Sequence, residues 1–170
     1  MDGDVHLRDI RMSIGGATIH AAHASGATAA QFRPIGAVLL AAAGAEGSIS
    51  LWDIRRLTET AGELSFHGGA ITGLQWSPFS DTVLLSYGAD GRVVLWHLAK
   101  ASLPLDHSKN RLAPPAVSFV HIGHVCRVTD ASWNFSNAEE WLLASADTTN
   151  GLQVYRPRRD VVQEYRAYEQ

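Results

Sequence analysis

The chain has 170 residues, of which 46% are hydrophobic and 18% charged, so it is long enough to build a globular core of its own. Its formal net charge of −3 argues against a nucleic-acid-binding protein, because such proteins carry a clear excess of Lys and Arg. Its longest apolar run, residues 35–45, is too short to span a membrane, which takes ~20 residues.

The predicted elements are nearly all strands, separated by short turns. In chain order, the segments with strand character are 18–22, 38–52, 63–66, 71–76, 83–85, 93–96, 117–121 and 141–155. A Gly-Ala-Asp-Gly turn at 88–91 joins two of them. One helix is expected at 160–168, where Val161, Val162 and Tyr165 share a face.

Three series of residues recur in step along these segments. They are Phe32, Trp76 and Trp133; Trp52, Trp96 and Tyr155; and His23, His67 and His124. The first two members of each series are 44 residues apart, and each histidine precedes the aromatic residue of the first series by 9 positions. Arg8-Asp9 lies one period before Trp52-Asp53 and indicates the end of one more repeat. A period of ~40–45 residues with a Gly-His start and a Trp-Asp end is the WD-repeat signature.

The repeats predict an all-β fold: a partial WD-repeat β-propeller of about three four-stranded blades, with the last strands of a preceding blade and a short C-terminal helix. Since propellers have ~4–8 blades, three would leave two flanking faces uncovered. We therefore expect the C-terminal part of a longer propeller, completed by its remainder or by another chain. The expected divisions are 1–22 for the incomplete blade, 23–66, 67–121 (with a long loop at 97–116) and 122–156 for the blades, and 157–170 for the tail or helix.

WD-repeat blades resemble one another in a buried polar tetrad: a loop His, a strand Ser or Thr, a turn Asp and the closing Trp. The second full repeat has all four, as His67, Ser86, Asp90 and Trp96. A buried imidazole and carboxylate must satisfy each other, because leaving either unpaired costs ~1–3 kcal/mol. We therefore expect these four residues to have a structural role.

The other two repeats depart from this pattern. The matching positions are His23, Ala42, Glu46 and Trp52 in the first full repeat, and His124, Ser145, Thr149 and Tyr155 in the third. Because Ala42 has no hydroxyl, the first network is expected to be degraded. The third repeat has a two-residue insertion, and Asp147 is the candidate to replace its missing turn carboxylate.

We find no catalytic or metal-binding constellation, so we expect no enzyme, no metal and no cofactor. Histidines that occur once per repeat lie in separate blades and cannot converge on one ion. The remaining histidines follow no metal-ligand spacing: His6, His20, His97, His107 and His121. Cys126 is the only cysteine, which excludes an intrachain disulfide and predicts a packed thiol in a reducing compartment. The basic cluster Arg156, Arg158 and Arg159 is expected to be a solvated chain exit.

Two stretches carry a more specific resemblance. One is His67–Pro78 with Gly88–Trp96, and the other is Pro114–His124 with Val128–Asn134. The long loop, its Pro-Pro, the Phe-x-His-x-Gly-His segment and the Asp-x-Ser-Trp-Asn strand resemble the last blades of the histone-binding WD-repeat proteins. These are the retinoblastoma-binding subunits of chromatin assembly, deacetylase and methyltransferase complexes. Ribosome-assembly WD-repeat proteins share the Pro-Pro loop and the Phe-Val-His segment.

The resemblance implies a site that grips a histone helix between an N-terminal helix and an acidic loop ending in Pro-Pro. The matching loop here, residues 103–115, sets Asp106 against Lys109 and Arg111 and so loses that acidity. Its apolar residues still predict a groove for an amphipathic helix. The candidate partner-binding residues are Leu105, Asp106, Leu112, Pro114 and Pro115.

A second implied site lies on the top face, where a Glu and an aromatic residue just after the loop His hold a basic histone tail. Ala70 and Thr72 occupy those positions here. An Ala cannot pair a Lys or Arg, and a Thr cannot stack on a guanidinium group. The sequence therefore weakens the histone contact that the family implies at this place.

We expect a non-catalytic scaffold in the nucleus, with the cytoplasm as a second compartment. It is interpreted as a histone-binding-like subunit of chromatin assembly or modifying complexes, with histones or other complex subunits as partners and no direct nucleic-acid or membrane binding. The alternative is a WD-repeat scaffold in another assembly such as ribosome biogenesis, which the lost histone-contact residues and the shared Pro-Pro loop favour.

Overall fold

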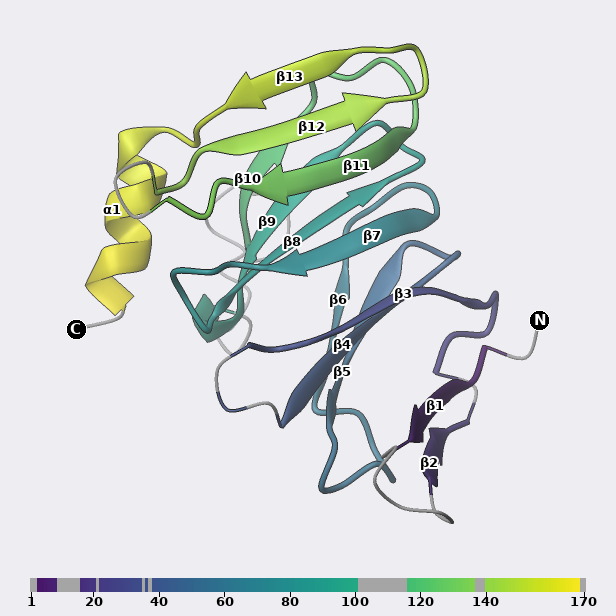
Figure 1. The fold of residues 1–170 in the computed structure, drawn as a ribbon. Coiled ribbons are helices and arrows are strands. Elements are labelled where there is room, and N and C mark those ends of the chain that lie inside the picture. The colour runs from purple at the N-terminus through teal and green to yellow at the C-terminus, as the bar shows by residue number, and fades with distance from the viewer. Residues whose placement is uncertain are drawn as a thin grey trace, which may run out of the picture.

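The computed structural model describes residues 3–8, 16–20, 22–34, 36, 38–100, 116–136 and 140–168. Within them the chain forms successive antiparallel sheets, each built as a meander of consecutive strands (Figure 1). A two-stranded sheet comes first, made of β1 (Val5–Arg8) and β2 (Gly16–Ile19). The sheets lie face to face along the chain, as expected for blades of a partial propeller.

Two four-stranded sheets and one three-stranded sheet follow. The first contains β3 (Ala27–Phe32), β4 (Leu39–Gly44), β5 (Ser48–Asp53) and β6 (Gly62–Ser65). The second contains β7 (Ile71–Trp76), β8 (Val83–Gly88), β9 (Val93–His97) and β10 (Val117–His121). The last contains β11 (Val128–Trp133), β12 (Leu143–Asp147) and β13 (Leu152–Tyr155). These are referred to below as the first, second and third blades.

Alternate residues of each strand face the two neighbouring sheets, and this alternation builds the core. In the second blade, Val94 and Trp96 are buried against the first blade, in one cluster with Ile49. Val93 and Leu95 face the other way and pack against the third blade. Burying a side chain of this size contributes ~1.5–3 kcal/mol, so the contacts between blades stabilise the fold.

The first and second blades are each hydrogen-bonded to the next blade through a glutamine that no sequence argument identified. The Trp76 backbone N–H donates to the Gln31 side-chain oxygen at 2.7 Å, and its indole N–H donates to the Gln31 carbonyl at 3.1 Å. Trp133 donates in the same way to Gln75, at 3.1 and 3.5 Å. The two glutamines stand just before the first aromatic residue of their own repeats, so the same link joins first to second and second to third blade.

The inner strands share a bulge near their start, and a threonine occupies it in every blade. The register shifts between Ala27 and Ala29 in β3, and at the matching points of β7 and β11. Such bulges add one residue against the partner strand and increase the twist. The extra residues Thr28, Thr72 and Thr129 each donate a hydroxyl hydrogen bond to a carbonyl of the neighbouring strand.

The predicted C-terminal helix is present as α1 (Arg159–Tyr168), and Val161 and Val162 pack against the third blade. The prediction of an outer strand at 18–22 is wrong in its bounds. β2 ends at Ile19 because its partner β1 begins at Val5, and these two residues pair. None of the helical segments in the part of the chain that the structure describes is long and apolar enough to cross a bilayer.

Candidate functional site: the blade tetrads and the surfaces they hold

The second blade brings His67, Ser86, Asp90 and Trp96 together in one continuous hydrogen-bonded chain. The His67 Nδ1–H donates to the Asp90 carboxylate, at 3.0 and 3.1 Å from its two oxygens. The Ser86 hydroxyl lies 2.7 Å from His67 Nε2 and accepts from the Trp96 indole N–H at 2.8 Å. The loop before β7, the turn after β8 and the strand β9 are thereby fixed to one another.

In the third blade Asp147 supplies the turn carboxylate, as predicted from the insertion. Its Oδ2 lies 2.9 Å from His124 Nδ1, while His124 Nε2 lies 2.6 Å from the Ser145 hydroxyl. Thr149 does not replace the carboxylate but donates to it, through its backbone N–H and its hydroxyl. Tyr155 takes the place of the closing Trp, and burial raises the pKa of its phenol to about 12.

The prediction that the first blade has a degraded network is wrong. Ser50, on β5, supplies the hydroxyl that Ala42 lacks: it lies 2.9 Å from His23 Nε2 and accepts from the Trp52 indole N–H at 2.8 Å. Ala42 and Ser50 are direct partners in the β4–β5 register, so the hydroxyl reaches the same space from the opposite strand. Glu46 accepts from the His23 Nδ1–H as the turn carboxylate. The missed signal was a serine two residues before the closing Trp.

The carboxylates of the second and third blades are held in the ionised form. Burial opposes ionisation of Asp90, but the hydrogen bond and charge of His67 outweigh it and lower the pKa of Asp90 below its usual value. The pKa of Asp147 is lowered chiefly by the hydrogen bonds from Thr149 and then by the bond from His124. This arrangement fixes the histidine loop to the turn of the same blade.

In the first and second blades, the turn after the second strand packs against the histidine loop of the next blade. Gly47 has φ +90°, and a Cβ there would lie 2.7 Å from the His67 carbonyl oxygen. Gly91 has φ +72°, and a Cβ there would lie 3.0 Å from the His124 carbonyl oxygen. In the third blade Asn150 takes the left-handed conformation instead, at φ +64°.

Ala70 and Thr72, the two top-face positions, differ in the groups that they present to a ligand. Ala70 is half-buried and its carbonyl accepts from the Ala89 N–H at 2.8 Å. Thr72 donates across the blade boundary to the Val128 carbonyl at 2.7 Å as well as within its own blade. Thr72 is therefore part of the contact between blades. The threonine that stands here in place of an aromatic residue links the second blade to the third.

The outer face of the third blade is apolar and uncovered. Leu152 and Val154 on β13 occupy the places that Val93 and Leu95 hold on β9. Val93 and Leu95 are fully buried by the next blade, whereas Leu152 is 72% exposed and Val154 62% exposed. Exposed apolar residues arranged like an interior blade face mark a surface suited to protein contact.

Other residues singled out in the sequence are placed as follows. The candidate partner-binding residues lie outside the described residues: Leu105, Asp106, Leu112, Pro114 and Pro115. Cys126 is half-buried. Among the residues with described placement, no group of three His, Cys, Asp or Glu side chains is arranged to hold a metal ion.

Comparison with known proteins agrees with this architecture. The family model for the WD domain, G-beta repeat, matches residues 58–97. Residues 58–97 are a WD40 repeat. A chain in the crystal structure of a mitotic checkpoint complex superposes with a TM-score of 0.72 at 19% identity, over 92% of this chain and 43% of that chain, and shows the shared WD-repeat fold. WD40 repeats are typically non-catalytic.

Short stretches of the chain are also similar to curated proteins. Over 49 residues it is 41% identical to the probable histone-binding protein rba-1 of Caenorhabditis elegans. Over 49 residues it is 45% identical to histone acetyltransferase type B subunit 2 of Mycosarcoma maydis, and over 43 residues 44% identical to that of Aspergillus oryzae. The stretches cover 25–29% of this chain and 9–11% of the relatives.

Proposed function

We propose that this chain acts in the nucleus as a non-catalytic WD-repeat scaffold, a histone-binding-like subunit of chromatin assembly or modifying complexes. The observation that supports this most is the 41–45% identity to a probable histone-binding protein and to subunits of histone acetyltransferases. The proposal takes each sheet as one blade of the scaffold.

The blade geometry supports a role in binding. Each tetrad fixes a histidine loop and a turn at the same edge of its sheet, so that these loops stand in set positions before a partner arrives. Preorganised loops bind with a smaller entropic cost than flexible ones, and loops on a rigid scaffold are where binding residues concentrate.

The proposal places the histone contact away from Ala70 and Thr72. Ala70 has no carboxylate to pair with a basic tail, and the Thr72 hydroxyl is engaged with Val128. Among the described residues, the surface that remains for a histone is the uncovered face with Leu152 and Val154.

Direct binding to purified core histones tests the proposal. Because the chain is acidic, any polycation is attracted to it, and poly-lysine is therefore the matched competitor. We expect histones to bind at least tenfold more tightly than poly-lysine at physiological salt; equal affinities would contradict the proposal. A70K locates the contact: an unchanged histone affinity is expected, and a loss would place the histone on the top face.

A further inference from the structure

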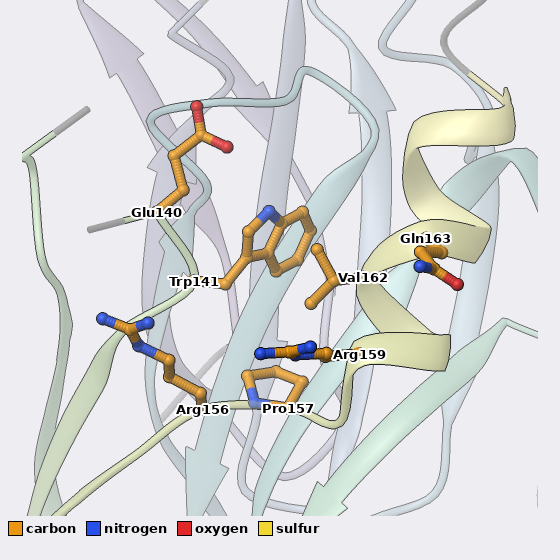
Figure 2. Close-up of a pocket in the computed structure, with 7 residues that line it drawn as sticks. All are labelled: Glu140, Trp141, Arg156, Pro157, Arg159, Val162 and Gln163. Carbon is orange, nitrogen blue, oxygen red and sulfur yellow. The ribbon is translucent and has the colours of Figure 1, made fainter. Parts of the chain in front are cut away.

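The two ends of the β12–β13 hairpin are held differently. At one end, Trp141 and Pro157 line a surface cavity of about 290 Å³ beside Val162 of α1 (Figure 2). Val162 packs against the same apolar cluster that contains Trp141, so the helix fixes this end of the hairpin. The other end is the turn of residues 147–151, in which Asn150 is exposed. This turn can therefore open while the rest of the hairpin stays in place.

The geometry of the turn favours Asn150 and requires Gly151. Residue 150 has φ +64°, a left-handed conformation that glycine and asparagine tolerate best. A Cβ at residue 151 would lie 2.6 Å from the Asp147 carboxylate oxygen Oδ2, so only glycine fits there. The other two blades have Gly47 and Gly91 at the left-handed position, and neither is followed by a second glycine. The third blade thus holds an Asn-Gly pair, the only such pair in the sequence.

An Asn-Gly pair is chemically labile. The backbone nitrogen of the glycine, once it has lost its proton, bonds to the side-chain carbonyl carbon of the asparagine, and the side-chain nitrogen leaves with that proton as ammonia. Water then opens the resulting succinimide ring to aspartate or to isoaspartate. The reaction needs no reagent other than water. Glycine favours it because the absence of a Cβ removes the hindrance to ring closure.

In the folded chain Asp147 holds the nitrogen that must react. The Gly151 N–H donates to Asp147 Oδ1 at 2.9 Å, and the Asp147 N–H donates to the Gly151 carbonyl at 3.0 Å. Hydrogen bonds from Thr149 and His124 lower the pKa of Asp147 and keep it ionised. This negative charge opposes removal of the amide proton, since the amide anion would carry a like charge. The reaction therefore requires the turn to open and Asp147 to release the nitrogen.

We propose that Asn150 is a site of spontaneous deamidation whose rate is set by the tetrad of the third blade. Asp147 also lies 2.9 Å from His124 Nδ1, so the contacts that fix the His124 loop keep the Asn-Gly pair closed. Ring closure removes the hydrogen that Gly151 donates to Asp147, and isoaspartate lengthens the backbone of the turn. Both changes loosen the His124 loop as the protein ages. The inference does not depend on the proposed histone contact.

Incubation of the full chain at mildly alkaline pH, followed by peptide mapping with mass spectrometry, measures the conversion of Asn150. We expect Asn150 to react in the folded chain, about tenfold or more slower than in the chain unfolded in guanidinium chloride. Ser145→Ala removes the hydroxyl that lies 2.6 Å from His124 Nε2 and leaves residues 147–151 unchanged. It should accelerate the reaction about tenfold, as the loss of one buried hydrogen bond predicts. Ser50→Ala, the same change in the first-blade tetrad, is the matched control and should stay within twofold.

Asn150→Gly separates the modification from general ageing of the chain, because it places the residue of the other two blades at this position. The urea midpoint of the wild type should fall during the incubation, whereas that of Asn150→Gly should not. No conversion of Asn150 in the folded chain, equal rates in the folded and unfolded chains, or equal acceleration by Ser145→Ala and Ser50→Ala would overturn the proposal. Equal falls of the midpoint in the wild type and Asn150→Gly would overturn the link between deamidation and the third blade.

Discussion

Moving one hydroxyl between strands tests how the first blade is held. Ser50 accepts from the buried Trp52 indole at 2.8 Å and lies 2.9 Å from His23 Nε2. Ser50→Ala therefore leaves the indole N–H without an acceptor and removes the hydroxyl from His23 Nε2. An orphaned buried donor costs ~1–3 kcal/mol, and that is the loss of unfolding free energy we expect.

The double variant Ala42→Ser with Ser50→Ala should recover ~1 kcal/mol of that loss, close to the value of one hydrogen bond. Its serine occupies the position of Ser86, whose hydroxyl makes both corresponding bonds in the second blade, and it faces residue 50 in the register. Urea unfolding followed by tryptophan fluorescence measures the change as a midpoint shift at constant slope. Ser65→Ala, at an exposed site on β6, is the control.

The reasoning fails if Ser50→Ala unfolds at the wild-type midpoint, or if the double variant is less stable than Ser50→Ala alone. Either result would mean that the hydroxyl does not support the first blade as its contacts indicate.

Three further predictions concern the links within and between blades. Gln75→Ala should cost ~1–2 kcal/mol of unfolding free energy, because the buried Trp133 N–H loses its acceptor; urea unfolding measures it, and an unchanged midpoint would exclude the link. Gly47→Ala should lower the free energy of unfolding by ~1–3 kcal/mol, because residue 47 has φ +90° and its Cβ would meet the His67 carbonyl oxygen. Asn150→Gly should leave the free energy of unfolding nearly unchanged. Equal effects of the two substitutions on the thermal midpoint would contradict the strain argument. The pKa of Asp147 is lower in the folded chain than in the unfolded chain, so ionised Asp147 stabilises the fold above the unfolded pKa of ~3.9, and this stabilisation is lost as pH falls. The urea midpoint of Asp147→Asn should therefore fall less between neutral and acid pH than that of the wild type. Parallel curves of midpoint against pH would refute this.

Periodic features could be predicted from the sequence, and features that depend on register could not. The spacing of His67 and Trp96 predicted a blade because the repeat places the same residue types at the same phase. The hydroxyl of the first blade was missed because matching by position pointed to Ala42. Only the pairing of Ala42 with Ser50 shows that a serine on the opposite strand reaches the same imidazole.

The contacts between blades could not be predicted from the sequence either. Gln31 and Gln75 each precede an aromatic residue, and this recurrence was visible, but nothing in it indicates that the glutamine binds the next blade. The prediction that the arginine cluster is solvated is confirmed, since Arg156, Arg158 and Arg159 are all exposed. The division of the cluster, with Arg158 on Asp160 and Arg159 on a cavity, depends on where α1 packs against the third blade.

Affinity purification of the tagged full-length protein from nuclei of its own cells, followed by mass spectrometry, tests the central claim most directly. The account predicts that core histones are recovered together with subunits of deacetylase, acetyltransferase or assembly complexes. Recovery of ribosomal proteins or of an unrelated assembly, with no histones, would contradict it and would leave the resemblance as one of fold and ancestry.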